Sequence, residues 1–402
     1  MNETPLLLQT LPVTLFSLRV AVVTETYPPE INGVAMTIER MVKGLQARNH
    51  QVQLIRPKQS SIDKASSFPK FEEVLKPGLC IPRYEGLKIG LPAKAALTRL
   101  WMMKRPDIVH IATEGPLGWS ALSAAIKLKL PAVTDFHTNF HTYSQHYGLG
   151  LLHSTLNTYL RKFHNKGMVT LVPTEKLRDE LQQHGYNNLM VLGRGVDTQL
   201  FNPQRRQAEL RHQWGATGND TVALFVSRLA PEKNLHVVIE SWLQMRTINP
   251  RTKLVMVGDG PERAALQAAQ PEVIFTGMRT GMDLAEHYAS ADVFLFPSTT
   301  ETYGNVTMEA MASGLAVVAY DYAAAHEHIQ HQQNGLLAKF NDVDDFAHQS
   351  MHLAANPQHA WQLGSNARRT TETLDWEKIH DRFEAVLLDV LHELEIGHPQ
   401  SA

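Results

Sequence analysis

Short apolar runs alternate with helix-length amphipathic segments along almost the whole chain, and this alternation limits the fold more than any other feature. The runs are rich in Val and Ile and end in polar residues, which is typical of buried strands. The apolar runs of the first half are LRVAVVTETY, HQVQLIRP, DIVHIAT, PAVTDFH and GMVTLVPT. Helical stretches such as Val34 to Arg48 and Leu117 to Leu128 separate several of these runs. Strand, helix and strand in repetition predict a parallel sheet with helices on both faces.

The alternation pauses once, in the polar, glycine-bearing stretch GRGVDTQLFNPQRRQAELRHQWGATGND. It restarts with TVALFVSRL, TKLVMVGDG, EVIFTGM, DVFLFPS, LAVVAYD and NGLLAKF. At 402 residues the chain is also too long for one ordinary hydrophobic core. We therefore expect two doubly wound α/β domains in tandem, residues 18–200 and 205–372. A last helix over residues 373–396 is expected to pack back on the first domain.

Composition narrows the class of protein. With 43% hydrophobic and 19% charged residues the chain has the make-up of a soluble globular protein. A formal net charge of -2 supplies no general attraction to nucleic acid, so we expect no nucleic-acid partner. The one cysteine, Cys80, excludes an intramolecular disulfide and a cysteine-rich zinc module, which fits a reducing cytoplasm.

The apolar head PLLLQTLPVTLFSL, from Pro5 to Leu18, raises the alternative of an export signal. It has no basic segment before it, and it is interrupted by polar residues and a proline. No run approaches the roughly 18 apolar residues that a membrane span needs. We expect a cytoplasmic protein, either soluble or peripheral at the inner face of the cell membrane.

Charged side chains follow the first strand of the second half, in the stretch FVSRLAPEKN. Ligands of open parallel sheets bind beyond the carboxyl ends of the strands, so residues there are the first functional candidates. We expect a helix to begin near Pro231, with Arg228 before it and Lys233 in its first turn. Backbone amides and the positive helix end favour an anion there, and two cations suit a diphosphate. The alternative is a pair of surface cations bonded to nearby carboxylates.

The stretch VMVGDGPER predicts a second strand, turn and helix. Gly258 and Gly260 would allow the tight turn, and Pro261 would take the first helical position. The stretch lacks the GxGxxG spacing, so the fingerprint of nicotinamide-cofactor binding is absent. We expect no cofactor.

Two glutamates stand eight positions apart in STTETYGNVTMEAMASG. Glu301 is predicted to lie on a loop after a strand, and Glu309 about one turn into the following helix. Carboxylates can accept hydrogen bonds from two sugar or ribose hydroxyls, and the loop amides around Tyr303, Gly304 and Asn305 could hold phosphate oxygens. The alternative makes Glu301 a helix-capping acid and Glu309 a solvated helix residue.

In their context these residues resemble the retaining glycosyltransferases of family 4, which have the GT-B fold of two Rossmann-like domains facing across a cleft. The hallmark of the family, a Glu, seven residues and a second Glu, stands here as FPSTTETYGNVTMEAMASG. TETYPPEINGVAMTIERMVKGLQARNHQV is similar to the family's amino-terminal loop and first helix, and VSRLAPEKN to its diphosphate-binding motif. VGDGPER and GVDTQLF also match, and all these segments follow the family's order. The resemblance implies an enzyme, a hexosyltransferase.

The resemblance implies a role for each matching residue. Arg228 and Lys233 would hold the donor diphosphate, Glu309 the two ribose hydroxyls, and Glu301 the hydroxyls of the transferred sugar. It also implies that the anomeric configuration is retained, without a metal ion and without a clear enzyme nucleophile. The two glutamates are then binding groups and not the paired carboxylates of a hydrolase.

Further residues match the family outside this motif. Gly33 would let the amino-terminal loop approach the diphosphate or the sugar without an intervening side chain. The family often has two adjacent glycines here; this chain has Asn32 before Gly33, so Asn32 could make a contact of its own. His137 matches a histidine that the family places beside the transferred sugar. Backbone groups near Met278 and Arg279 would lie beside the nucleobase.

Two patterns raise the alternative of a metal site. The first is a histidine-rich stretch with no cysteine near it and no HExxH motif, containing His137, His141, His146 and His153. The second is the Asp342-x-Asp344 pair, which stands just before a helix, where Asp is an ordinary N-cap. We expect both to be structural and predict no metal site.

The acceptor is the least constrained partner. The set TETYPPEINGVA, DFHTNF and GRGVD most resembles the branch with mannosyltransferases and sugar transferases to diacylglycerol or phosphatidylinositol. The donor would be GDP-mannose or a UDP-sugar, and the acceptor a lipid or glycan. The basic and apolar stretch LKIGLPAKAALTRLWMMKRPD could touch an anionic membrane, or could be an ordinary helix that packs its Leu and Trp inward. Mannose is the favoured sugar. The first alternative function is a UDP-sugar-dependent glucosyl- or sulfoquinovosyl-type transferase to a lipid, and the others are a sugar-nucleotide epimerase and an inactive nucleotide-binding relative.

Overall fold

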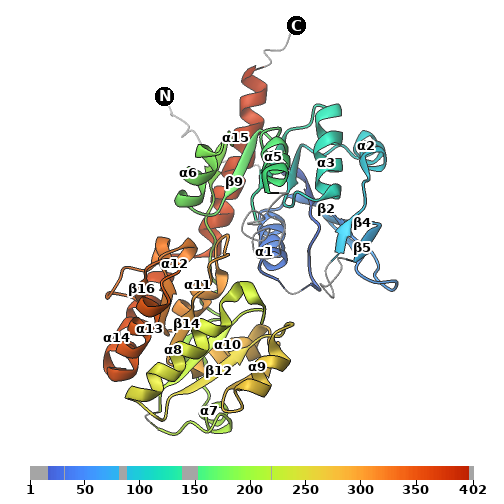
Figure 1. Cartoon of the computed structure of the whole chain (residues 1–402). Helices are drawn as coiled ribbons and strands as arrows, with labels where there is room; N and C mark the ends of the chain where they lie inside the picture. Colours follow the sequence, from blue (N-terminus) through green and yellow to red (C-terminus); the bar gives the residue numbers. More distant parts are fainter. Residues whose placement is uncertain (1–16, 31, 81–87, 138–152, 219, 398–402) are drawn as a thin grey trace, which may run out of the picture. The chain divides into compact units, whose positions relative to one another are not determined.

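The computed structural model describes residues 17–30, 32–80, 88–137, 153–218 and 220–397 (Figure 1). Two sheets dominate this part of the chain. The first has eight strands in the order β10-β9-β8-β7-β1-β2-β4-β3, and β1 runs parallel to both of its neighbours. The second has six strands in the order β13-β12-β11-β14-β15-β16, with every neighbouring pair parallel. The predicted α/β class with two Rossmann-like parallel sheets is confirmed.

The strands have the following bounds. The first sheet contains β1 (Arg19–Val23), β2 (Gln51–Pro57), β3 (Ser67–Phe68), β4 (Phe71–Lys76), β7 (Ile108–Ile111), β8 (Ala132–Asp135), β9 (Val169–Val172) and β10 (Leu189–Val191). The second contains β11 (Val222–Val226), β12 (Lys253–Val257), β13 (Ile274–Gly277), β14 (Val293–Phe296), β15 (Ala316–Tyr320) and β16 (Leu336–Ala338). A separate antiparallel pair consists of β5 (Gly78–Cys80) and β6 (Lys88–Gly90).

Helices connect the strands of both sheets. Those before β11 are α1 (Gly33–Ala47), α2 (Lys94–Met103), α3 (Pro116–Lys127), α5 (His153–His164), α6 (Glu175–Gln183), the 3-10 turn η2 (Pro203–Arg205) and α7 (Ala208–Gln213). Those after β11 are the 3-10 turn η3 (Pro231–Lys233), α8 (Leu235–Ile248), α9 (Arg263–Ala269), α10 (Gly281–Ser290), α11 (Asn305–Ala312), α12 (Ala323–His328), α13 (Val343–Ala355), α14 (Pro357–Thr371) and α15 (Trp376–Gly397).

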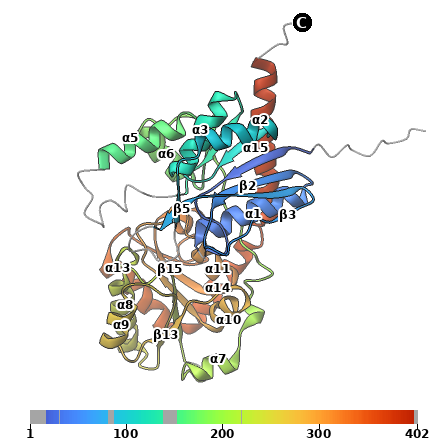
Figure 2. The same ribbon diagram turned by 90° about the vertical axis from the view of Figure 1, so that its right-hand side faces the viewer.

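The second sheet is buried on both faces. Every residue of β11, β14 and β15 is buried, because helices cover a parallel sheet on its two sides. Figure 2 shows α8, α9 and α13 on one side of this sheet and α10, α11 and α14 on the other. The continuous apolar runs of the sequence are therefore strands of a two-sided core.

The chain divides into two compact units, residues 1–134 with 386–402, and residues 135–385. The domain bounds expected from the sequence, 18–200, 205–372 and 373–396, stay a prediction. Within the described residues, no helix combines the length and the apolar character that a membrane crossing requires.

The short strands outside the two-sided core were not predicted. Both residues of β3 are exposed, and β5 has two exposed residues out of three. Such strands carry no run of buried Val or Ile, so the pattern that identifies core strands is absent.

The basic helix α2 has Leu97 and Trp101 buried, and Trp101 Nε1 donates to Gln53 Oε1 at 3.0 Å. The inward-packing alternative is therefore correct for these two side chains. Met102 and Met103 remain exposed, at 71% and 78%.

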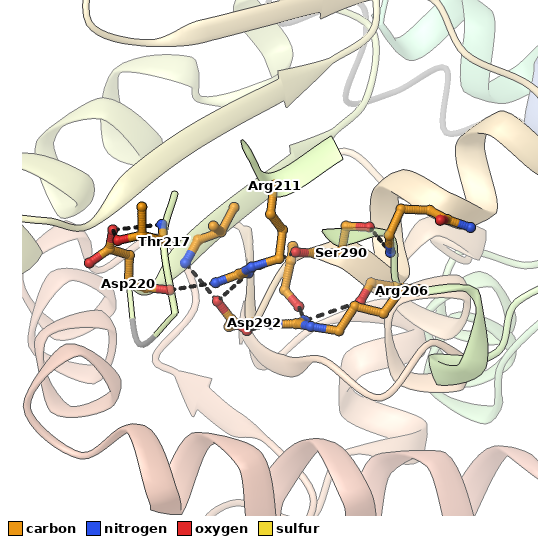
Figure 3. Close-up of polar contacts among 10 residues, drawn as sticks. Arg206, Arg211, Thr217, Asp220, Ser290 and Asp292 are labelled. Atoms are coloured by element: carbon orange, nitrogen blue, oxygen red, sulfur yellow. Dashed lines mark hydrogen bonds and ion pairs between the residues drawn. The ribbon is translucent and has the colours of Figure 1, made fainter. Parts of the chain in front are cut away.

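A polar network fastens the chain before β11 to the amino end of β14 (Figure 3). Asp292 accepts from Arg206 Nη2 at 2.7 Å and from Arg211 Nη1 at 3.0 Å, and it also accepts from the backbone N of Val222 at 2.8 Å. Arg211 also donates to the backbone oxygens of Ser290, at 2.9 Å, and of Asp220, at 2.7 Å. One carboxylate and two arginines thus fix η2, α7 and the start of β11 together, at the end of the sheet opposite the strand carboxyl ends.

Candidate active site

Lys233 and Glu301 meet beyond the carboxyl ends of β11 and β14. Lys233 Nζ forms an ion pair with Glu301 Oε1. Ser298 Oγ donates to the same carboxylate oxygen at 2.7 Å and lies 3.5 Å from Lys233 Nζ. The two charged side chains are only 11% and 18% exposed. The sequence placed both residues at strand ends but did not predict this direct contact.

Arg228 has a carboxylate partner as well. Its guanidinium pairs with Glu232, four positions along the chain, which is fully buried. Sequence reasoning missed Glu232, although the Arg-x-x-x-Glu spacing within the loop was a signal for it. Arg228 and Lys233 are thus each paired with a nearby carboxylate, as the alternative considered from the sequence proposed.

The helix after this loop begins later than expected. Pro231 to Lys233 form a 3-10 turn, and Asn234 then adopts the left-handed conformation with φ 51°. The side-chain amide of Asn234 donates to the Pro297 carbonyl at 2.9 Å, and α8 starts only at Leu235. Asn tolerates this conformation better than most residues. The hydrogen bond from Asn234 to Pro297 ties the loop after β11 to the loop after β14. Because α8 starts only after Asn234, Lys233 lies outside the α-helix.

Two glycines let the loop after β12 pack against the loop after β11. Gly258 has φ +133°, and a Cβ there would lie 1.9 Å from the Ser227 carbonyl oxygen. A Cβ on Gly260 would lie 2.3 Å from the Leu229 carbonyl oxygen. The predicted tight turn is present, but Pro261 stands in the turn itself, since α9 begins at Arg263. The close approach of two backbones explains both glycines.

Glu309 lies within α11 and is half-buried, so it is not a solvated helix residue. Tyr288 Oη donates to its Oε2 at 3.0 Å. Burial raises the pKa of Glu309 to about 7, and the Tyr288 hydrogen bond opposes this shift. Burial and the neighbouring Glu309 together raise the pKa of Tyr288. Sequence reasoning missed Tyr288, which comes from α10, because no local spacing connects it with α11.

The loop between the two glutamates is held by Tyr303 and Gly304. Gly304 is the N-cap of α11 with φ 96°, so α11 is capped by glycine and not by Glu301. Tyr303 is buried, and its hydroxyl donates to the Arg194 carbonyl at 3.1 Å. His328 Nε2 lies 3.0 Å from the same hydroxyl, and burial lowers the pKa of His328 to about 4. Asn305 is the first residue of α11 and is half-buried.

His137 follows β8 and is held by two residues that the sequence did not single out. Its Nε2 lies 2.9 Å from Asp135 Oδ2, and its Nδ1 lies 3.3 Å from Arg194 Nη2. Arg194 Nη2 also bonds Asp135 Oδ1 at 3.2 Å. Asp135 ends the same strand, but Arg194 comes from the segment after β10, so only the fold brings them together.

The expected nucleobase segment follows β13. Met278 is 50% exposed. Arg279 donates to Asp283 Oδ2 at 3.0 Å and to the Thr276 carbonyl at 2.9 Å. The Arg279 side chain thereby links β13 with α10.

Gly33 belongs to the other compact unit, where it is the first residue of α1. Asn32 is the N-cap of this helix: its Oδ1 accepts from the Ala35 N at 2.8 Å, and its amide donates to Thr26 Oγ1 at 2.8 Å. The contact expected of Asn32 is therefore a structural one.

The structure describes the Asp342-x-Asp344 pair but only part of the histidine-rich stretch. Asp342 is the N-cap of α13 and accepts from the backbone N of Asp345 at 3.0 Å, as predicted. His141 and His146 lie outside the described residues, as do Pro5 to Phe16 of the apolar head. Where the structure describes the chain, no three His, Cys, Asp or Glu side chains are grouped so that they could hold a metal ion.

Comparison with known proteins decides the family. Residues 31–200 match the model of Glycosyltransferase Family 4, and residues 220–356 match that of Glycosyl transferases group 1. The GDP-mannose-dependent alpha-mannosyltransferase of Corynebacterium glutamicum is 33% identical over 376 residues, which cover 93% of this chain and 88% of that one. The chain belongs to glycosyltransferase family 4. It is therefore an enzyme of the hexosyltransferase class.

One further relative and one solved structure are also similar to this family 4 enzyme. The alpha-monoglucosyldiacylglycerol synthase of Acholeplasma laidlawii is 27% identical over 399 residues, covering 93% of this chain and 98% of that one. Among solved structures, sucrose-phosphate synthase from Thermosynechococcus elongatus matches with a TM-score of 0.78 at 18% identity, covering 94% and 100% of the two chains. This likeness shows the GT-B fold.

Proposed function

We propose that this glycosyltransferase moves a mannosyl residue from GDP-mannose to a lipid or glycan acceptor, with retention of configuration and without a metal ion. The observation that carries the donor assignment is the similarity, along nine-tenths of the chain, to a GDP-mannose-dependent alpha-mannosyltransferase. The chemistry is supported by two cations at the strand ends where a parallel sheet binds its ligand.

The cations stabilise the leaving group in this proposal. The bond between the anomeric carbon and the diphosphate oxygen breaks, and negative charge grows on the diphosphate. Arg228 and Lys233 face that charge, which is electrostatic catalysis. The acceptor hydroxyl oxygen bonds to the anomeric carbon on the face that the diphosphate leaves, and the hydroxyl proton passes to the departing phosphate.

The remaining site residues bind and orient the donor. Glu309 accepts hydrogen bonds from the ribose hydroxyls, and Glu301 and His137 contact the transferred sugar. Met278 and Arg279 border the nucleobase. The loop amides of Tyr303, Gly304 and Asn305 hold phosphate oxygens.

A second candidate is transfer from a UDP-sugar to diacylglycerol. The alpha-monoglucosyldiacylglycerol synthase relative, similar along nearly its whole length, favours a lipid acceptor. Peripheral contact with an anionic membrane fits the exposed Met102 and Met103 beside the exposed cations Lys94, Arg99 and Lys104.

Thermal unfolding of the purified enzyme with GDP, UDP, ADP and their sugar conjugates, in the presence of EDTA, tests the donor and the metal independence together. A ligand that binds only the native state raises the midpoint according to its concentration relative to its Kd. We expect GDP and GDP-mannose to raise it. A rise with UDP compounds alone would favour the second candidate, and a dependence on added metal would contradict the metal-free mechanism.

A further inference from the structure

Three charged or polar side chains are buried together where β8 ends. Asp135 is 1% exposed, Arg194 is 3% exposed and His137 is 8% exposed. Arg194 Nη2 contacts both of the others, Asp135 Oδ1 at 3.2 Å and His137 Nδ1 at 3.3 Å, while its Nη1 donates to the Leu192 carbonyl at 3.2 Å. We name these three residues the His137 cluster.

The cluster selects one tautomer of His137. A guanidinium is only a donor, so the ring nitrogen that faces it, Nδ1, must be the acceptor. The proton of the neutral ring then lies on Nε2, on the side of Asp135 Oδ2 at 2.9 Å. A carboxylate is only an acceptor, so it favours the same tautomer. Both partners therefore make Nε2 the donor of the ring.

The cluster is also joined to the loop that carries Glu301. Thr302 Oγ1 donates to the His137 carbonyl at 2.7 Å, and the Tyr303 hydroxyl donates to the Arg194 carbonyl at 3.1 Å. These two hydrogen bonds run from consecutive residues of the loop to two different members of the cluster. The position of the loop and the position of the imidazole are thus linked.

Stability alone does not account for this arrangement. Burying an ion pair removes two charges from water, and a well-packed apolar group at the same place is often as stable or more stable. What the ion pair supplies and an apolar group cannot is a fixed tautomer and ring orientation. Such partners of a functional histidine are common in binding sites.

We infer that Asp135 and Arg194 are positioning residues of the transfer reaction: they hold His137 in the Nε2-protonated tautomer and set it against the loop of Glu301. This inference rests on the proposed function, because the contact of His137 with the transferred sugar is part of that proposal. His137 is thereby fixed in one tautomer and one ring orientation beside the loop of Glu301.

The tautomer can be measured directly by 15N NMR on enzyme labelled at histidine. The signals of His137 are those lost in His137→Gln. In the wild type we expect a protonated Nε2 and an unprotonated Nδ1. In the double variant Asp135→Asn with Arg194→Met, neither the donor at Nδ1 nor the carboxylate at Nε2 remains, so a shifted or mixed pattern is expected. An unchanged pattern in this variant would overturn the inference.

Kinetics test whether the orientation matters for transfer. Asp135→Asn and Arg194→Lys should each lower kcat by about 100-fold, the loss typical of a misplaced group, while KM for the donor changes little. Lys keeps the charge of Arg194 but lacks the planar fork that reaches both partners, so it should not restore activity. Asp220→Asn, at a buried aspartate in the network of Figure 3, is the matched control and should keep its kcat.

The two proposals fail in different ways. If the wild-type enzyme transfers no sugar from any tested donor, the proposed function fails, whereas the NMR result still decides the tautomer. If the wild type is active and Asp135→Asn and Arg194→Lys match the control in kcat, the positioning role is wrong while the proposed function stands.

Discussion

At the scale of single residues, Glu309 makes stability depend on pH. Its folded-state pKa is about 7 because of burial, above the ordinary value of 4.5. The folded state therefore binds more protons than the unfolded state between these values, so this residue lowers stability as pH rises through that window. We expect Glu309→Gln to raise the unfolding midpoint relative to wild type at pH about 8, and to lose this advantage below pH about 4.5.

The control for this prediction is Glu240→Gln, at an exposed position of α8, which should show no such pH-dependent difference.

The charge of Glu309 also bears on ligand binding. If Glu309 holds the ribose as a carboxylate, Glu309→Gln should weaken GDP, UDP and ADP compounds alike. Titration calorimetry that finds only one nucleotide affected would contradict the ribose role.

Arg228 and Lys233 carry the prediction for turnover. Arg228→Ala and Lys233→Ala should each reduce kcat by about 100-fold or more, the loss seen when one group that stabilises transition-state charge is removed. Lys339→Ala, at an exposed lysine, is the matched control. Initial rates with the identified donor measure the effect, and near wild-type rates in both site variants would refute the diphosphate role.

At the scale of elements, the network around Asp292 should contribute to stability and not to catalysis. Arg211→Met keeps apolar bulk but leaves the Ser290 and Asp220 carbonyls and the Asp292 carboxylate without that donor. We expect a loss of about 2–4 kcal/mol, because buried polar groups lose their partner. Chemical denaturation measures this loss.

Arg206→Met is the comparison within the same network. Arg206 is 41% exposed in its side chain, against 9% for Arg211. Arg206→Met should therefore lower the free energy of unfolding by less than Arg211→Met does, by about 1 kcal/mol or less. Both variants should keep kcat, because the network lies at the strand ends opposite the site. If the two variants lost equal stability, burial would not decide the contribution of each arginine.

Elements also show what the sequence could predict. The core strands follow from continuous apolar runs, which a sheet covered on both sides requires. The start of α8 does not follow, because Asn234 in a left-handed conformation bonds to Pro297, which is distant in the sequence. Pro261 gave a wrong helix start for the same reason: the turn is shaped by the contact of Gly258 and Gly260 with the loop of β11. Local signals fail where another segment sets the backbone.

At the scale of the whole molecule, the sequence identified the family through motifs placed in order along the chain. It also named the charged residues at the strand ends. It could not name Asp135, Arg194 or Tyr288, because their partners are identified only by contacts in three dimensions, whereas the spacing of Glu232 from Arg228 was a local signal that was missed. The prediction at this scale is that GDP and GDP-mannose raise the midpoint of thermal unfolding, because a ligand that binds only the native state stabilises the whole folded molecule.

The ion pair between Lys233 and Glu301 has a consequence for selectivity among anions. Glu301 is a tethered competitor for Lys233, present at the high effective concentration of an intramolecular ligand. A free phosphate or sulfate ion must displace it with few other contacts to help. In the proposed binding mode, a nucleotide sugar is also bound through its base, ribose and sugar hydroxyls, and those hydroxyls would donate hydrogen bonds to the displaced carboxylate. On the proposed function, the ion pair would therefore select the complete donor over simple anions.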